Sequence, residues 1–365
     1  MKQEKERILK LVEDGMLTAQ EALTLIEKLD HEYKEKEEQI TALSAEVQEP
    51  AEDFESGAKG SQKPSLGAKL FDWIDSAVKK VKEADLDLNF GHAHEVQHIF
   101  QFKDSEFSAI DMQIANGSVN IVPWADEDIR AECQAKVYRA DSQEAARTAF
   151  LQHIECEVKG NKFFVRTEKK TMKTNVTLYV PQKEYDKIRV KLFNGPIRGE
   201  HLHVKEFSAK TTNGVLSFSH LTADKASAET ANGQIKLAGH QCGAIEAETI
   251  NGLIDLRGSS ESIDVQSFNG NIMLTVTAPH CRSIYTKTTT GNVDIALPDD
   301  SAVKAELKSN LGSLSHELID AEILKEKNDT IQKELMLASN QGHDQHLSIF
   351  SESLTGAIKL KHTQR

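Results

Sequence analysis

The chain has 365 residues, of which 28% are charged and 39% hydrophobic, and its formal net charge is −13. This length is enough for two or three domains and a sizeable core. The acidic excess argues against nucleic acid as a partner, and the sequence has no 18-residue apolar run that would predict a transmembrane helix.

The first segment predicts a helical hairpin at residues 3–30. Gly15 separates two apolar stripes, and Thr18 forms a capping box with Glu21 at the start of the second helix. A hairpin this small cannot bury both stripes by itself, so we expect it to bind a protein partner or to self-associate. The stripe residues that define this docking surface are Leu9, Val12, Leu23 and Ile26.

A charged helix completes a first domain at residues 1–47, and a flexible linker is expected at residues 48–65. Residues 1–60 hold 16 acidic and 8 basic side chains, so their net charge is 8 − 16 = −8. The N-terminus lacks the apolar core of a secretion signal, and the four cysteines show no Cys-x-x-Cys spacing. We therefore expect reduced thiols and a cytoplasmic location.

Residues 66–84 predict an amphipathic helix with lysines beside its apolar face. One interpretation is a cap over the open end of a repeat domain, where strand edges would otherwise be exposed. The alternative is a helix at a membrane surface, with aromatic side chains in the interface and lysines toward anionic lipid. The residues that support both interpretations are Leu70, Phe71, Trp73, Ile74, Val78 and Val81.

Residues 85–365 carry a repeat that is marked by Asn-Gly or Thr-Gly pairs. Four successive steps between the asparagines from position 194 onward are 19, 19, 19 and 18 residues. We assign turns to Asn116, Asn194, Asn213, Asn232, Asn251, Asn269, Thr290 and Thr355. On both sides of each turn apolar and polar residues alternate, which is typical of strands with one buried face.

The fixed period favours a mainly β fold, a β-solenoid of ~19-residue coils, over a meander or a sandwich. A chain of Asn-Gly hairpins would also explain the turns, but it does not require a constant period. In a solenoid the equivalent residues form columns, and the Asn column becomes a side-chain amide ladder. An insertion near residues 125–187 interrupts the coils, with a strand at 129–138, a helix at 141–154 and a hairpin at 155–180.

Two patterns suggest catalysis and are weighed against structural interpretations. His94, Glu95 and His98 match the H-E-x-x-H motif of zinc proteases, which requires a helix so that both histidines reach one metal ion. The residues around them alternate as in a strand, so a structural strand is favoured. Asp255 and Asp264 are the nearest candidates for the carboxylate pair of a carbohydrate hydrolase.

Two segments resemble a known family. Residues 8–22, Ile-Leu-Lys-Leu-Val-Glu-Asp-Gly-Met-Leu-Thr-Ala-Gln-Glu-Ala, look like the SHOCT-like helical hairpin. Residues 81–91, Val-Lys-Glu-Ala-Asp-Leu-Asp-Leu-Asn-Phe-Gly, together with the Asn-Gly repeats, are similar to the YvlB/LiaX-like proteins of Gram-positive bacteria. The C-terminal part of those proteins is the β-repeat family named "putative adhesin". The resemblance implies a connection with cell-envelope stress and does not imply an enzyme.

The sequence therefore predicts a non-enzymatic interaction or scaffold protein that needs no cofactor or metal. We expect it to act in the envelope-stress response, in the cytoplasm or peripherally at the inner face of the cell membrane. Its expected partner is a protein bound by the hairpin, with membrane contact as a second expectation. The alternatives are a surface adhesin or peptide-binding protein and, more remotely, a zinc or carbohydrate hydrolase.

Overall fold

A computed structural model describes residues 93–103, 105–329, 332–340 and 346–363. These residues are mainly β, as the repeat predicts, with one α-helix among them. The expected hairpin, the linker and the helix at 66–84 lie outside the described residues.

The first part of the described chain contains seven strands and the helix. They are β1 (Ala93–Phe102), β2 (Ala109–Trp124), β3 (Ile129–Tyr138), α4 (Gln143–His153), β4 (Glu155–Lys159), β5 (Lys162–Thr167), β6 (Met172–Pro181) and β7 (Glu184–Asn194). The repeats continue with β8 (Ile197–Glu200), β9 (His203–Asn213), β10 (Leu216–Ser219), β11 (Thr222–Asn232), β12 (Ile235–Asn251), β13 (Ile254–Asn269), β14 (Ile272–Val276), β15 (Ser283–Thr290) and β16 (Val293–Leu297). The last strands are β17 (Val303–Ser309), β18 (Leu314–Glu317), β19 (Ala321–Asn328), β20 (Lys333–Ser339), β21 (Leu347–Ser353) and β22 (Ile358–His362).

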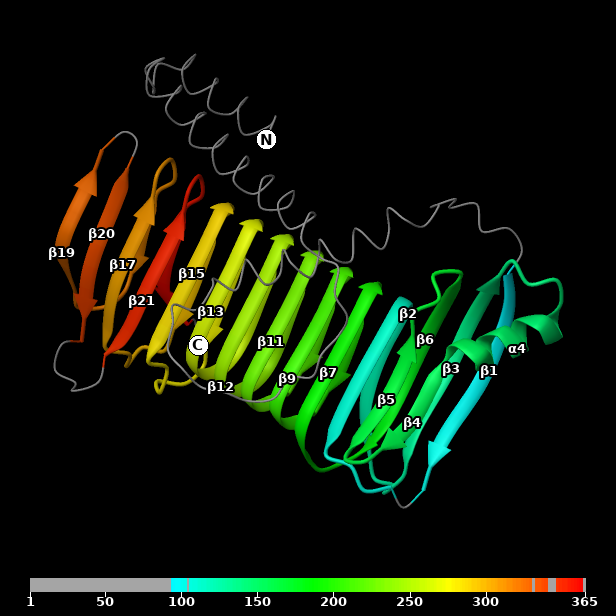
Figure 1. Ribbon diagram of the computed structural model, residues 1–365. Coiled ribbons are helices and arrows are strands. Elements are labelled where there is room, and N and C mark those ends of the chain that lie inside the picture. Colours follow the sequence, from blue (N-terminus) through cyan, green and yellow to red (C-terminus); the bar gives the residue numbers. More distant parts are fainter. Residues whose placement is uncertain (1–92, 104, 330–331, 341–345, 364–365) are drawn as a thin grey trace, which may run out of the picture. The chain divides into compact units, whose positions relative to one another are not determined.

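The strands pair in two ladders that the turns and the long strands connect. The first ladder, which we call the A sheet, contains the strands that lead into the Asn-Gly turns: β7, β9, β11, the second halves of β12 and β13, and β15. The second, the B sheet, contains the strands that follow the turns: β8, β10, the first halves of β12 and β13, β14 and β16. All these pairs are parallel, so successive repeats stack as coils, whereas a meander would pair them antiparallel. Figure 1 shows the A-sheet strands side by side.

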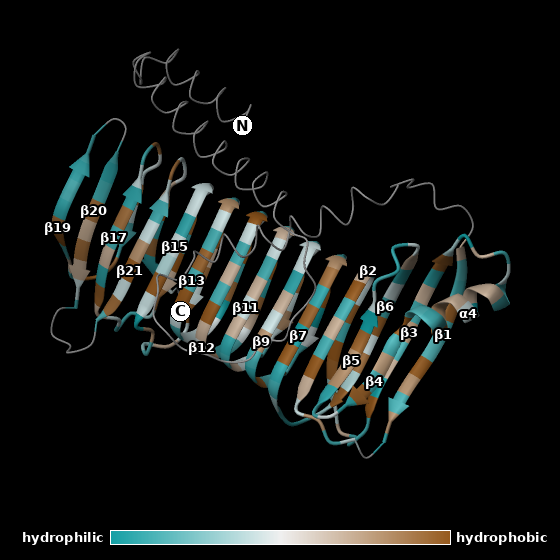
Figure 2. Ribbon diagram, viewed as in Figure 1, coloured by the Kyte–Doolittle hydropathy of each residue, from teal (hydrophilic) through white to brown (hydrophobic). Residues whose placement is uncertain are grey.

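Alternation along the strands places the core between the two sheets. Ala209, Ala228 and Ala247 occupy one column of the A sheet and are at most 2% exposed. Ile197 and Leu216 occupy a column of the B sheet and are fully buried. The bands of Figure 2 show the same alternation along each strand. Small residues in one sheet thus face branched residues in the other, which fills the narrow interior without voids.

The Asn column forms a continuous ladder of side-chain amides. Asn213 donates its Nδ2 hydrogen to Oδ1 of Asn194 at 2.8 Å, and Asn232 does the same to Asn213 at 2.9 Å. Two residues before three of the asparagines, a Thr hydroxyl donates to a Gly carbonyl of the neighbouring coil, as from Thr230 to Gly214 at 3.1 Å. Glycine is required after the Asn because the coils approach closely there. A Cβ on Gly214 would lie 1.9 Å from the carbonyl oxygen of Gly195.

The coils do not follow the sequence order at either end of the stack. The first coil, β2, lies between the later coils β5/β6 and β7/β8. The last coil, β21/β22, lies between β15/β16 and β17/β18 (Figure 1). A solenoid in which each coil stacks on the one before it in the sequence therefore does not describe the ends. Insertion gives each terminal coil parallel neighbours on both sides, so its apolar residues are fully covered.

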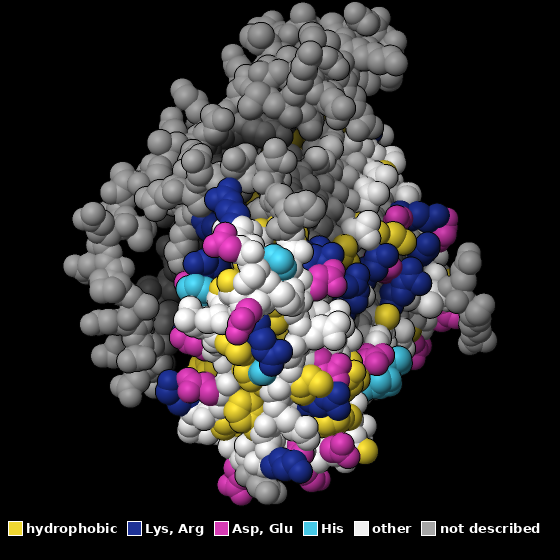
Figure 3. Space-filling view, turned by 90° about the vertical axis from the view of Figure 1, so that its right-hand side faces the viewer, with side chains coloured by type: hydrophobic (Ala, Val, Ile, Leu, Met, Phe, Trp, Pro, Cys, Tyr) yellow, Lys and Arg dark blue, Asp and Glu magenta, His cyan; other side chains and the backbone are white. Residues whose placement is uncertain are grey.

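The two ends of the stack are instead formed by strands that come from the interior of the sequence and pair antiparallel. At one end β3 pairs antiparallel with β1 and β6, β4 pairs with β5, and α4 packs on β1 and β3. Ser142 caps α4, and Phe150 buries the helix against the core. At the other end β20 pairs with β17, and β19 forms the last strand of the A sheet. Seen from the α4 end, charges of both signs are interspersed with apolar side chains (Figure 3).

Candidate binding surface

The H-E-x-x-H motif lies on strand β1 and not on a helix. Glu95 forms an ion pair with Lys136 of β3 at 3.2 Å, and the ring of His98 packs edge-on against Phe100 with centroids 4.4 Å apart. On a strand, residues four positions apart are separated by about 13 Å. The strand interpretation is therefore confirmed, and His94 and His98 cannot bind one ion as the protease motif requires.

The two acidic candidates for glycoside hydrolysis lie on different sheets. Asp255 points outward from the B sheet and accepts two hydrogen bonds from Arg257, at 3.0 and 3.1 Å. Asp264 lies on the A sheet. Two carboxylates on opposite faces cannot act on one glycosidic bond, so these two candidates do not form a hydrolase pair.

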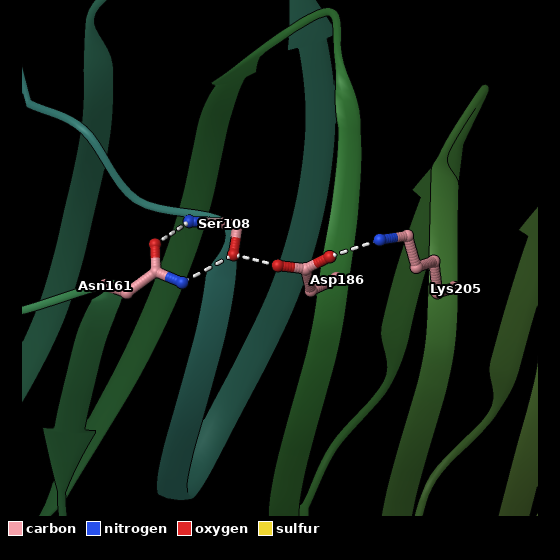
Figure 4. Close-up of polar contacts among 4 residues, drawn as sticks. All are labelled: Ser108, Asn161, Asp186 and Lys205. Carbon is pink, nitrogen blue, oxygen red and sulfur yellow. Dashed lines mark hydrogen bonds and ion pairs between the residues drawn. The ribbon is translucent and has the colours of Figure 1, made fainter.

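A polar network joins four segments of the chain, namely the residues before β2, the β4–β5 turn, β7 and β9 (Figure 4). The Ser108 hydroxyl accepts a hydrogen bond from Asn161 at 2.7 Å and donates one to Asp186, whose other oxygen binds Lys205 at 2.7 Å. These hydrogen bonds lower the pKa of Asp186 and raise the pKa of Lys205. Lys205 does not contact the serine, and the hydroxyl proton is held by a carboxylate. The network thus fastens the inserted coil to its neighbours, and the lowered pKa makes the Asp186 carboxylate a weak base toward Ser108.

The outer face of the A sheet carries the strongest electrostatic feature of the described residues. Three columns point outward there, five, three and one residues before each Asn. We call these columns the A-face rows. Along the stack the row at minus three reads Lys191, Lys210, Glu229 and Glu248. The row at minus five adds Arg189 on the basic side and Glu246 and Asp264 on the acidic side. Basic coils are thus followed directly by acidic coils.

The acidic part of the A-face rows contains carboxylates that are buried and incompletely paired. Glu229 and Glu248 are 5% and 4% exposed. One oxygen of Glu229 binds Lys210 at 2.5 Å, but Oε2 of Glu229 and Oε1 of Glu248 have no hydrogen-bond partner among the described residues. Burial, reinforced by the charges of Glu229 and Asp264, raises the pKa of Glu248 to about 8. Burial also raises the pKa of Asp264.

The basic part shows the opposite perturbation. Burial and the nearby charges of Arg189 and Lys210 lower the pKa of Lys191 to about 8. Lys210 lies near Glu248, and Asp111 and Glu229 lie near Lys191, but these opposite charges do not offset the burial of either group. Strongly perturbed groups of this kind mark a candidate functional surface.

The row at minus one adds apolar side chains beside these charges. Phe193, Ile250 and Phe268 are half-buried, and Ala231 is 3% exposed. An apolar stripe next to incompletely paired charges is the composition of a protein-binding surface. The sequence contains this signal, because positions minus three and minus one can be read from the Asn column. The acidic candidate Asp255, four residues after Asn251, lies instead in an outward row of the B sheet.

Two further properties of the described residues restrict the chemistry. No group of three or more histidine, cysteine or acidic residues in this part of the chain is arranged to hold a metal ion. No helix in the described ranges is long and apolar enough to cross a membrane.

Comparison with other proteins identifies the relatives of the chain. It is 83% identical over all 365 residues to the Bacillus subtilis protein named "Uncharacterized protein YvlB", with the full length of both chains covered. A crystal structure from Bacteroides fragilis, named "putative adhesin", is 15% identical and matches 73% of this chain and 97% of its own, with a TM-score of 0.36. A structure from Parabacteroides distasonis, named "Putative lipid binding protein", is 12% identical with the same coverage and a TM-score of 0.40.

Two domain families match the sequence directly. Residues 3–34 match the SHOCT-like domain, at the place of the predicted hairpin. Residues 107–360 match the Toastrack DUF4097 family, and this match spans the stacked coils from the inserted first coil to β22. The chain belongs to the Toastrack DUF4097 family and carries a SHOCT-like domain before its repeats.

Proposed function

We propose that the chain is a non-enzymatic interaction protein whose stacked coils present the A-face rows to a protein partner. The observation that carries the proposal is the pair Glu229 and Glu248, which point outward yet are buried and incompletely paired. Desolvation of Glu248 disfavours its ionised form, and a basic partner group would recover that free energy. The SHOCT-like domain supplies a second protein contact through its apolar stripes.

The proposed place of action is the inner face of the cell membrane, in the response to envelope stress. This part rests on the resemblance of residues 8–22 and 81–91 to the YvlB/LiaX-like proteins. The stacked coils give the protein a stiff body, and the SHOCT-like domain gives it a small docking module. Such an arrangement suits a scaffold that connects a partner to a membrane-associated complex.

A site-specific photo-crosslinker tests the binding surface in cells. We place it at Ile250, in the apolar row of the A face, and at Met273, an exposed residue on the B sheet, as the matched control. We expect Ile250 to crosslink one protein that Met273 does not reach. In a second arm, Glu229→Lys with Glu248→Lys should abolish that crosslink, whereas Asp294→Lys on the B sheet should retain it. Equal products from both crosslinker positions would contradict the proposal.

The site of action needs a separate measurement. Cells are fractionated after exposure to a membrane-active antibiotic, and the chain is followed with and without residues 1–47. We expect the full chain to move to the membrane fraction and the shortened chain to remain in the cytosol. If the antibiotic changes the distribution of neither chain, the membrane part of the proposal is wrong. The A-face surface is tested separately, by the photo-crosslinker.

A further inference from the structure

The charges on the A face change sign halfway along the stack. The midpoint lies between the coil of Lys210 and the coil of Glu229, with lysines on the two coils before it and glutamates on the two coils after it. From β2 to β13 the row at minus three reads Gln113, Lys191, Lys210, Glu229, Glu248 and Gln266, and the row at minus five reads Asp111, Arg189, Ser208, Ser227, Glu246 and Asp264. Reversing the order of the four central coils therefore places each glutamate opposite a lysine.

A second copy that faces this sheet brings about such a reversal. When a two-fold axis runs along the strands between two identical sheets, each row faces its own counterpart and the order of the coils is reversed. With the axis at the midpoint, Lys210 faces Glu229 of the second copy, and Lys191 faces Glu248 of the second copy. The strands of the two sheets stay nearly aligned, which is a common arrangement of two sheets that pack face to face.

The other positions of the A-face rows agree with this arrangement. It brings together pairs of matching polarity, which are Arg189 with Glu246, Ser208 with Ser227, Gln113 with Gln266, Phe193 with Ile250, Thr212 with Ala231, and Ala115 with Phe268. One pair is unfavourable, because Asp111 faces Asp264 at the outermost of the six coils. A guanidinium nitrogen of Arg189 lies 3.9 Å from the Asp111 carboxylate and offsets part of that repulsion.

The charged groups nearest the midpoint are incompletely paired within one copy. Lys210 binds one oxygen of Glu229 at 2.5 Å. The other oxygen of Glu229 and one oxygen of Glu248 have no hydrogen-bond partner among the described residues. Burial and the nearby charges of Arg189 and Lys210 lower the pKa of Lys191. The two-fold arrangement adds an ammonium group at each of these carboxylates and a carboxylate at Lys191.

We propose that the A face binds a second copy of the chain, related by a two-fold axis between the coils of Lys210 and Glu229. The proposal rests on the proposed function, because it names the partner of the same surface. Six coils and three rows cover about 29 Å by 17 Å, or about 500 Å² on each copy. An interface of about 1,000 Å² in total is small for a specific complex, so we expect a dimer that dissociates at concentrations on the order of micromolar.

Analytical ultracentrifugation of the full chain measures the dimer. We expect the average mass to rise from one chain toward two between about 1 and 100 μM. Because the contact is charged, raising NaCl from about 0.05 M to about 0.5 M should weaken the association on the order of tenfold. Self-association through the SHOCT-like domain would be the same in all variants of the coils, so differences between those variants report on the A face alone.

Charge reversal supplies two complementary variants. Lys191→Glu with Lys210→Glu makes the four central coils acidic, and Glu229→Lys with Glu248→Lys makes them basic. Each variant alone should associate on the order of tenfold more weakly than the wild type, or less. An equal mixture of the two should associate again, because an acidic face then meets a basic one.

The matched control exchanges two charges on the B sheet, Lys236→Glu with Asp294→Lys, and should leave the association unchanged. Thermal unfolding of each variant verifies that its coils are folded. A mixture that associates no better than its separate components, with both components folded, would contradict the proposal.

A crosslink in the wild-type chain tests the contact without any substitution. A carbodiimide joins a lysine amine to a carboxylate only when the two are in contact. Lys191 and Glu248 are three coils apart in one chain, or about 14 Å, so a crosslink between them joins two copies. We expect this product in the dimer, and its absence from a wild-type sample that is dimeric would overturn the proposal.

The photo-crosslinker at Ile250 separates this inference from the proposed function. In the two-fold arrangement Ile250 faces Phe193 of the second copy, so the expected product is a dimer of the chain. If Ile250 captures a different protein and the wild-type chain is monomeric, the inference is wrong and the proposed function stands with another partner. If Ile250 captures nothing, both are wrong.

Discussion

The central coils and the two ends of the stack follow different rules. From β7 to β16 each coil stacks on the preceding one, and the Asn ladder is unbroken from Asn194 to Asn269. At the ends the terminal coil is inserted one place inward, and antiparallel strands occupy the outermost positions. In the centre, repeated hydrogen bonds and core contacts between equivalent residues stabilise the coils. At the ends, the addition of further coils has to be prevented.

The difference shows that a parallel stack has to be terminated by a change of hydrogen-bonding pattern. An open parallel edge would present unpaired backbone groups to another copy. Strand β19 shows how one end avoids this: a register shift lies between Ile323 and Lys325, and the strand carries charges of both signs. Bulges and edge charges are devices that disfavour pairing with further strands. The predictions below compare the centre with the ends, beginning with the largest expected effect.

Glycine substitutions should separate the two regions most clearly. A Cβ on Gly233, in the centre, would lie 1.8 Å from the carbonyl oxygen of Gly214. Both groups are backbone and cannot move independently, so Gly233→Ala should lower the free energy of unfolding by about 3 kcal/mol or more. Gly160, in the β4–β5 hairpin at the end, has φ of +56° and nothing within 4 Å of the added Cβ. Gly160→Ala should cost only about 1–2 kcal/mol from backbone strain.

Denaturant unfolding of the two variants, followed by circular dichroism, measures this difference. A shift in midpoint as large for Gly160→Ala as for Gly233→Ala would show that the ends are held as tightly as the coils.

One central position departs from its column and should make the centre sensitive to acid. His240 occupies the column of Leu202 and Leu221, is 1% exposed, and neither of its ring nitrogens has a hydrogen-bond partner in the part of the chain that the structure describes. Burial lowers its pKa to about 4 from an ordinary value of 6.5. Below about pH 6.5 the imidazole is protonated in the unfolded chain but stays neutral in the folded chain. The free energy of unfolding therefore decreases as the pH falls from 6.5 to 4.

His240→Leu should remove this pH dependence and restore the column. We expect a gain of about 1–3 kcal/mol at pH 7 from removing unpaired buried nitrogens, and a larger gain at pH 4. Thermal unfolding between pH 4 and pH 8 measures it, with Leu221→His as the converse variant. An identical pH profile for the wild-type and His240→Leu chains would contradict the assignment.

The A-face rows should give the opposite pH dependence. The pKa of Glu248 is raised to about 8, so the folded chain retains a proton that the unfolded chain loses above about pH 4.5. The resulting penalty grows as the pH rises from 4.5 to 8 and is complete above 8. Glu248→Gln should therefore stabilise the chain by about 1–3 kcal/mol at pH 8 and leave it unchanged at pH 4.

The control for Glu248→Gln is Glu352→Gln, in the same row near the end of the stack. Glu352 is paired with Lys287 at 3.4 Å, and its side chain is 39% exposed. We expect this substitution to leave stability nearly unchanged, because exposed ion pairs contribute little. Equal stabilisation by both variants would show that the burial of Glu248 does not set its behaviour.

The sequence predicts the centre of the fold well because each rule there is local. Period-2 alternation, the Asn-Gly pair and the constant step place the strands, the turns and the parallel stacking without any distant information. The position of β2 and β21/β22 between other coils could not be predicted from such local patterns. Their columns match those of any other coil, so the pattern specifies which residues face the core but not which coil is the neighbour.

The candidate surface was only partly visible for a related reason. The positions that point outward on the A face can be identified from their distance to the Asn residues. The change from Lys210 to Glu229 in one of these columns is also evident from the sequence. The low exposure of Glu248 cannot be predicted from the sequence, because it depends on which residues surround an outward position in the folded chain. The H-E-x-x-H motif shows the converse case. Its residue types match a zinc-binding motif, but the alternation of the neighbouring residues predicts a strand, which the structure confirms.

The Asn ladder gives the smallest effect and the most direct comparison of centre with end. Asn232 is exposed and exchanges side-chain hydrogen bonds with Asn213 and Asn251, both at 2.9 Å. Asn116, at the inserted coil, is half-buried, accepts from Asn194 at 2.8 Å and donates to the carbonyl of Lys170 at 3.0 Å. Alanine at either position removes two hydrogen bonds.

We expect Asn232→Ala to cost about 1 kcal/mol, because water can replace the lost partners of its neighbours. Asn116→Ala should cost up to about 2 kcal/mol, since it leaves a less accessible carbonyl without a donor and loosens the contact between the inserted coil and the segment before β6. Denaturant midpoints measure both variants, and hydrogen exchange shows where each one opens. If the ladder is uniform, the two costs are equal, and the inserted coil is held by its core alone. If the order is as expected, the ladder also fastens the end segment to the coils.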